Sequence, residues 1–121
     1  MSKHPIVHVE FSAKDREVSG KFYADLFGWK VEQIPEMNYA SFEPGEGVGG
    51  GLNPVGENYP AGTVTVYIGT DDIEASLAKA EKLGGKAIVP KSEIPGFGWF
   101  GMFLDPSGNQ IGLYTAMAEG A

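Results

Sequence analysis

The chain repeats one pattern of strands, helix and turns, and this repeat limits the folds open to it. Three kinds of segment recur in the same order: an alternating strand, a helix end followed by a strand, and a turn begun by an acid and a proline. They are residues 7–11, 27–30 and 43–47, matched by residues 64–68, 83–86 and 105–109. Three matches in one order indicate an internal duplication.

The first copy begins with a strand and a helix. Over residues 6–12, Val7, Val9 and Phe11 alternate with polar residues, as in a half-buried strand. Ser12 and Asp15 stand where a capping residue and its reciprocal acid begin a helix. The helix that follows has an apolar stripe at four-residue spacing, typical of a face that packs on a core, with Gly28 as its stop. The stripe consists of Val18, Phe22 and Leu26, with Tyr23 and Phe27 beside it.

The other elements follow from the same signals. A second helix begins after Thr70-Asp71-Asp72, and Gly84 ends it. Its predicted buried stripe is Ile73, Leu77 and Ala80. The remaining strands are predicted over residues 29–33, 39–43, 48–53, 63–69, 86–89, 99–104 and 109–115. Neither half alone could cover its sheet, so residues 1–121 are expected to form a single domain, with one module over about residues 4–58 and the other over about 59–117.

The composition of the chain limits the classes of function that it can have. A chain of 121 residues with 42% apolar residues can bury a core, and it lacks both the long apolar run of a membrane span and a charged-then-apolar leader, so we expect a soluble, cytoplasmic protein. The absence of cysteine excludes disulfides, thiolate metal sites and thiol nucleophiles. The net charge of −7 disfavours nucleic-acid binding. It favours a cationic ligand, or it serves solubility alone.

Several segments together resemble the vicinal oxygen chelate superfamily, which includes glyoxalase I, bleomycin-resistance proteins and extradiol dioxygenases. The resemblance rests on His8, on residues 22–29, on Asp71-Asp72-Ile73 and on residues 105–113, and it spans nearly the whole chain. It implies an α+β fold of two βαβββ modules, each a curled mixed sheet with a helix on its outer face, that enclose a cavity. It also implies a homodimer.

The same resemblance points particular side chains into the cavity. Strand parity directs His8, Glu10, Thr65, Tyr67, Gly112 and Tyr114 inward, and these residues with Phe97 are the expected ligand-binding set. Tyr67 and Tyr114 could equally be core aromatics. Residues 92–100 read as a loop in which Phe97 could close over a ligand or cover an edge, whereas Trp99 is expected in the core.

Metal-dependent relatives are similar to one another in four ligand positions, usually His and Glu. Here those positions hold His8, Thr65, Gly112 and, by an alignment made ambiguous by the glycine run, Gly50. One imidazole, one hydroxyl and two glycines are too few ligands for zinc or an octahedral metal. We therefore predict no metal and no cofactor, although a site completed by a second chain is conceivable.

The two glycines allow two interpretations. They could leave space for a larger, less polar ligand, or they could allow close packing of strands. His8 could be a remnant hydrogen-bonded in a polar cavity, or a general base or ligand-binding group assisted by Glu10. These two residues are the candidate catalytic groups.

Three functional hypotheses follow. In the first, the chain is a glyoxalase- or bleomycin-resistance-like protein that binds a small molecule, cationic or aromatic, without a metal ion. In the second, it is a lyase, isomerase or dioxygenase-type enzyme that uses His8, with or without a metal completed by a second chain. In the third, the chain is a module that binds another protein. The sequence leaves open whether the chain is an enzyme.

Overall fold

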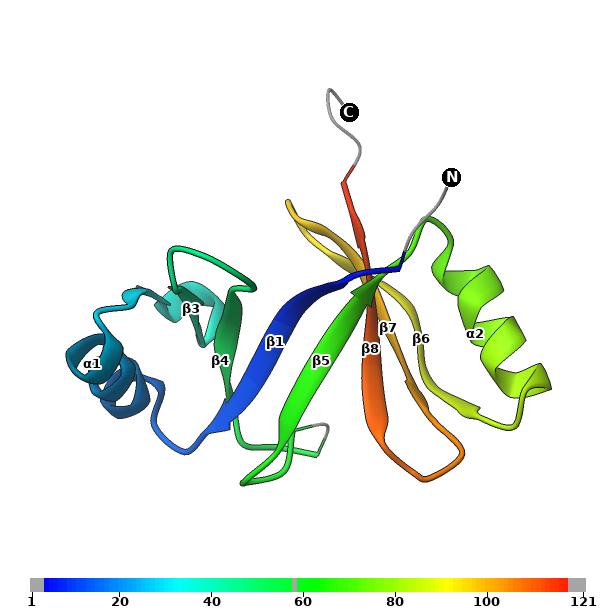
Figure 1. Ribbon diagram of the computed structural model, residues 1–121, viewed down its shortest axis with the longest axis horizontal. Coiled ribbons are helices and arrows are strands. Elements are labelled where there is room, and N and C mark those ends of the chain that lie inside the picture. Colours follow the sequence, from blue (N-terminus) through cyan, green and yellow to red (C-terminus); the bar gives the residue numbers. More distant parts are fainter. Residues whose placement is uncertain (1–3, 58, 118–121) are drawn as a thin grey trace. The chain divides into compact units, whose positions relative to one another are not determined.

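A computed structural model describes residues 4–57 and 59–117 (Figure 1). Its contacts divide the chain into two compact units, which we call the first module (His8–Val66) and the second module (residues 4–7 and 67–117). Asn58, at the predicted module boundary, lies outside the described residues. The elements are β1 (Ile6–Ala13), α1 (Arg16–Phe27), β2 (Lys30–Ile34), the 3-10 turn η1 (Pro35–Met37), β3 (Tyr39–Glu43), β4 (Gly50–Pro54), β5 (Val64–Gly69), α2 (Ile73–Lys82), β6 (Lys86–Ile94), β7 (Gly98–Leu104) and β8 (Gln110–Ala116).

The first module is a four-stranded mixed sheet with α1 on one face. Its strands lie in the order β2-β3-β4-β1, in which β1 and β4 are parallel and the other pairs are antiparallel. The core between sheet and helix contains Phe42 and Leu52, with Phe11, Tyr23 and Trp29 packed against it. The rings of Tyr23, Trp29 and Phe42 stack in succession, with centroids about 5 Å apart. Side chains of opposite parity on these strands therefore lie on the face away from α1.

Helix α1 begins later than predicted. Asp15, rather than Ser12, is its N-cap, and its carboxylate accepts hydrogen bonds from the backbone N–H groups of Glu17 and Val18. Gly28 ends the helix as predicted, with φ of 73° in the left-handed region that glycine adopts easily.

The predicted apolar stripe of α1 does not face the core. Val18, Phe22 and Leu26 are exposed by 66%, 57% and 56%. The opposite side of the helix packs instead, because Gly20 lets α1 approach the sheet: a Cβ on Gly20 would lie 2.9 Å from Cγ1 of Val31. The prediction that this stripe packs on the core was therefore wrong. The spacing identifies an apolar face of the helix, but a different face is buried.

The second module repeats this architecture. Its strands lie in the order β5-β8-β7-β6, with β5 and β8 parallel, and α2 runs beside β6 (Figure 1). Ile73 and Leu77 of α2 are buried as predicted, while Ala80 is half-buried. Trp99 packs against this core, as expected. Asp72 is the N-cap of α2, and its side chain accepts from the N–H of Ala75.

The predicted loop over residues 92–100 is mostly strand. β6 continues to Ile94 and β7 starts at Gly98, so only a short turn separates them. Two register shifts in the β6–β7 pairing interrupt the regular alternation that would have marked the longer strand.

The α+β class and the two βαβββ modules are confirmed. Neither described helix is both long and apolar enough to cross a membrane.

Candidate functional site

His8 and Glu10 lie on the face of β1 away from α1, as strand parity predicted. Glu10 is almost completely buried, with 4% of its surface exposed, whereas the side chain of His8 is 34% exposed. The imidazole Nε2 of His8 is hydrogen-bonded to Oε2 of Glu10. A buried carboxylate thus forms a hydrogen bond with a partly exposed imidazole. This bond fixes the orientation of the His8 ring.

Two further side chains complete a network around Glu10. The Tyr39 hydroxyl donates to Oε2 of Glu10, and Nδ2 of Asn53 donates to Oε1 at 2.6 Å. Nε2 of His8 also lies 3.1 Å from the Tyr39 hydroxyl. Both carboxylate oxygens therefore accept hydrogen bonds from the protein, which offsets much of the desolvation penalty of a buried charge.

The environment of Tyr39 favours its neutral form. Burial first, and then the negative charge and hydrogen bond of Glu10, raise the pKa of Tyr39 far above its ordinary value of 10.0, and Tyr59 adds to this effect. The phenol therefore keeps its proton and remains a donor to Glu10 throughout the neutral range.

A glycine on β4 makes room for Tyr39. Gly51 pairs with Glu10 in the parallel β1–β4 register, and a Cβ on Gly51 would lie 1.7 Å from the Tyr39 hydroxyl oxygen. Gly51, rather than Gly50, thus lies on the His8 face. Gly50 pairs with Val9, and a Cβ there would lie 1.8 Å from the Val9 carbonyl oxygen. In this module the Tyr39 side chain occupies the space above the glycine.

The second module shows a similar arrangement. Tyr67 pairs with Gly112 across β5 and β8, and a Cβ on Gly112 would lie 2.4 Å from the ring of Tyr67. Tyr67 is 7% exposed, and Gly112 is buried. Thr65, in the part of β5 that belongs to the first module, is fully buried, and its hydroxyl has no hydrogen-bond partner among the described residues. Both predicted inward positions of β5 are thus buried.

The last two predicted ligand contacts meet at one end of the β7–β8 hairpin. The Tyr114 hydroxyl donates to the carbonyl oxygen of Phe97 at 2.8 Å, and the N–H of Met117 donates to the same oxygen at 3.1 Å. The Phe97 side chain is 53% exposed. Six of the seven predicted site residues therefore fall into three contacts: His8 with Glu10, Tyr67 with Gly112, and Phe97 with Tyr114.

Sequence reasoning missed Tyr39 and Asn53. A signal for Tyr39 was present, because it begins a predicted strand and has the parity opposite to the buried Ala40 and Phe42. Asn53 could not be placed, because a one-residue slip of β4 against β1 reverses every side chain, and the glycine run left that register open.

The donor set does not fit a divalent metal. His8 and Glu10 are two donors, and their hydrogen-bonding neighbours are a phenol and a carboxamide NH₂. Over residues 4–57 and 59–117, no three His, Cys, Asp or Glu side chains gather as a metal site would require. A catalytic zinc site uses about three protein ligands of these types, and Glu10 already has hydrogen-bonding partners at both oxygens.

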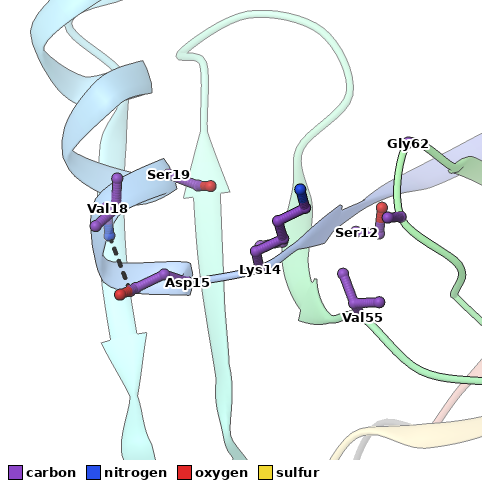
Figure 2. Close-up of a pocket in the computed structure, with 9 residues that line it drawn as sticks. Ser12, Lys14, Asp15, Val18, Ser19, Val55 and Gly62 are labelled. Carbon is purple, nitrogen blue, oxygen red and sulfur yellow. Dashed lines mark hydrogen bonds between the residues drawn. The ribbon is translucent and has the colours of Figure 1, made fainter.

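A separate cleft of about 330 Å³ lies at the end of β1 (Figure 2). It is lined by Ser12, Ala13, Lys14, Asp15, Val18, Ser19, Val55, Ala61 and Gly62, and by none of the four residues of the Glu10 network. The α1 N–H groups of Glu17 and Val18 are occupied by the Asp15 carboxylate. Because Asp15 occupies these two N–H donors, they are not available to bind an anion in the cleft.

Comparison with known proteins gave one matching family. A profile of the glyoxalase/bleomycin resistance protein/dioxygenase superfamily matches residues 5–113. A glyoxylase-like domain-containing protein of Didymella fabae is 32% identical over 119 residues, covering 88% of this chain and 90% of the fungal protein. A glyoxylase-type protein called CFP32, from Mycobacterium bovis, is 29% identical over 117 residues, covering 89% of this chain. The chain spans only 44% of that mycobacterial relative.

Among solved structures, the Mn(II)-bound glyoxalase of Novosphingobium aromaticivorans is similar to this chain, with a TM-score of 0.65 and 23% identity. The match covers 96% of this chain and 40% of that one. At 23% sequence identity, this similarity supports the assignment of the fold alone.

Proposed function

Because the chain belongs to the glyoxalase/bleomycin resistance protein/dioxygenase superfamily, we propose that it binds a small organic molecule through the His8 face of β1, without a metal ion. The observation that carries this proposal is the state of Glu10, whose two oxygens accept hydrogen bonds from His8, Tyr39 and Asn53. A carboxylate used in this way fixes the position of His8. The imidazole, as the more exposed partner, is then the group that meets the ligand.

The charge of the chain suggests the class of ligand. With a net charge of −7, the protein attracts cations over long range. Aromatic compounds suit a face that carries an imidazole beside a phenol ring, since flat rings stack on such groups. We therefore propose cationic aromatic compounds as ligands.

The test combines metal analysis with ligand screening. After exposure to zinc, manganese, nickel and iron, the purified protein should hold far less than one metal ion per chain by elemental mass spectrometry. Cationic aromatic compounds should raise its melting temperature, His8→Ala should abolish that increase, and His4→Ala should retain it. His4 is the matched control because it is the only other histidine and its ring contacts the Gly69 carbonyl in the second module. Stoichiometric metal uptake that disappears in His8→Ala would overturn the proposal, as would a screen with no stabilising compound.

A second candidate is an enzyme of the lyase, isomerase or dioxygenase kind, with His8 as general base. The His8–Glu10 hydrogen bond favours it, because a base held in position by a carboxylate is a recurrent arrangement in acid–base catalysis. A hemithioacetal is the first class of compound to assay, with and without added metal. Turnover lost in His8→Gln and kept in His4→Gln would support this candidate, and equal turnover in both variants would refute it.

A further inference from the structure

The second module has a cleft of about 380 Å³ beside α2. All of the residues that line it belong to the second module, and none of them belongs to the Glu10 network or to the cleft at the end of β1. Sites for small molecules have volumes of about 300–1,000 Å³. The cleft is therefore large enough for a small ligand.

The floor of the cleft is apolar because α2 covers only part of the sheet. The helix packs mainly on β6 and β7 (Figure 1), and Gly101 of β7 admits it, since a Cβ there would lie 2.9 Å from Cγ2 of Ile73. Leu113 of β8 pairs with both Gly101 and Ile68 of β5, so these residues share the face of the sheet that is turned toward α2. Phe103, two residues after Gly101, lies on the same face. Ile68, Phe103 and Leu113 line the cleft.

The polar residues of the cleft lie at its two ends. His4 lies where β5 ends, because its Nδ1–H donates to the carbonyl oxygen of Gly69 at 2.9 Å. Asp105 follows β7 near the end of α2, where a Cβ on Gly85 would lie 2.7 Å from the carbonyl oxygen of Leu104. Helix α2 begins shortly after β5 ends, so the cleft runs along the helix from a histidine to an acid.

Lys79 of α2 supplies a positive charge between these ends. In the part of the chain that the structure describes, neither ion pair involves this lysine. Asp105, the one acid among the described lining residues, accepts hydrogen bonds within its own turn. An anion bound in the cleft would therefore interact with Lys79 without competition from a carboxylate of this module.

We propose that this cleft binds an apolar carboxylate, a small organic acid in its ionised form. The carboxylate pairs with Lys79, and the hydrocarbon body covers Ile68, Phe103 and Leu113. The carboxylate points toward the His4 end of the cleft, because Asp105 repels it from the other end. A cation of the same shape is repelled by Lys79, and a neutral compound leaves Lys79 without a partner.

Calorimetric titration with octanoate, octanol and octylammonium tests the proposal, since these probes share one hydrocarbon chain and differ in their head groups. Octanoate should bind once per chain and most tightly. Lys79→Gln should weaken octanoate binding about tenfold, the effect of losing one charge-assisted hydrogen bond. Lys82→Gln should bind octanoate as the wild type does, because Lys82 is exposed on the same helix but does not line the cleft. Circular dichroism verifies that each variant folds.

Reversal of the charge and NMR test the position of the ligand. Lys79→Glu should lose affinity for octanoate and gain affinity for octylammonium. In the wild type, octanoate should shift the amide signals of Ile68 and Leu113. Shifts centred on His8 and Glu10 instead would overturn the proposal, because octanoate would then occupy the site proposed for cations.

Three calorimetric results would also overturn it. The first is a wild type that binds no octanoate. The second is equal affinity for the three probes, which would mean that the cleft adsorbs any hydrocarbon chain. The third is equal affinity of the wild type and Lys79→Gln for octanoate. None of these results depends on whether a ligand binds at His8.

Discussion

At the scale of single residues, each module fits a tyrosine against a glycine on the neighbouring strand. Added Cβ atoms would lie 1.7 Å from the hydroxyl oxygen of Tyr39 at Gly51, and 2.4 Å from the ring of Tyr67 at Gly112. Real non-bonded atoms do not approach so closely. The two glycines are therefore required by the rings above them, and interiors packed this closely respond to the addition of one methyl group.

Gly51→Ala should accordingly destabilise the protein. The new methyl group must displace the Tyr39 ring from Glu10, and overpacking of this kind lowers the free energy of unfolding by about 1–3 kcal/mol. Gly56→Ala is the control, because the nearest atom to its added Cβ is 3.9 Å away, and its effect should stay below about 0.5 kcal/mol. Urea denaturation measures both, and equal effects would contradict the packing described here.

Tyr39→Phe keeps the ring but removes its hydroxyl. Glu10 then loses one of its hydrogen-bond donors while it remains buried, so the free energy of unfolding should fall by about 1–3 kcal/mol at neutral pH. Tyr114→Phe removes a hydroxyl that donates to the backbone carbonyl of Phe97 in an exposed setting, and it should have the smaller effect. If denaturation ranks the two variants the other way, the Glu10 network contributes less than its geometry implies.

At the scale of elements, the turn between β7 and β8 is held by one carboxylate. Asp105 accepts hydrogen bonds from the backbone N–H groups of Ser107 and Asn109 and from the side chain of Asn109, each at 2.9 Å. The Asn109 side chain first, and then its backbone N–H, lower the pKa of Asp105 below its ordinary value of 3.8. These bonds explain why Asp105 begins this turn.

The lowered pKa predicts how this turn responds to acid. The contribution of Asp105 is fully present above pH 3.8, its unfolded value, and is lost as the pH falls through the lower folded pKa. The difference in unfolding free energy between wild type and Asp105→Asn should therefore shrink as the solution is acidified from about pH 5. Denaturation at several pH values measures this difference, and NMR titration of the Asp105 carboxyl reads its pKa directly. A difference that grows with acidification would contradict the prediction.

Elements with regular patterns were predictable. The strands of β1 and β5, the glycine after α1 and the acid that caps α2 follow from alternation and from the chemistry of helix ends, which are local. The buried side of α1 was not predictable, because Gly20 decides it through its approach to Val31 on a strand that the helix spacing does not reveal. Half of the Glu10 network was missed for a related reason: Tyr39 and Asn53 reach Glu10 across strand pairings rather than along the chain.

At the scale of the whole molecule, the two modules share two strands in the chain. Residues 6–7 of β1 belong to the second module, and the rest of that strand belongs to the first. Residues 64–66 of β5 belong to the first module, and the rest belongs to the second. A module that unfolds therefore releases a strand whose continuation lies in the other module, so we expect both modules to unfold in one transition.

The two tryptophans report on the modules separately, since Trp29 packs in the first core and Trp99 in the second. With Trp99→Phe and Trp29→Phe as single-tryptophan backgrounds, fluorescence should give coincident unfolding curves. Leu52→Ala, in the first core, should shift both curves equally and lower stability by about 2–5 kcal/mol. A shift confined to the Trp29 signal would show that the modules unfold independently.

The seating of Tyr39 over Gly51 also bears on how such a chain could change its chemistry over evolutionary time. Glutamate introduced at position 51 alone would collide with the phenol, and loss of the phenol alone would strip a donor from Glu10 without adding any acidic group. An acidic metal ligand at position 51 therefore requires a change at Tyr39 as well, and each change alone is expected to destabilise the present protein. Packing constraints of this kind can therefore limit which metal ligands a chain acquires through single substitutions, whatever ligand it binds.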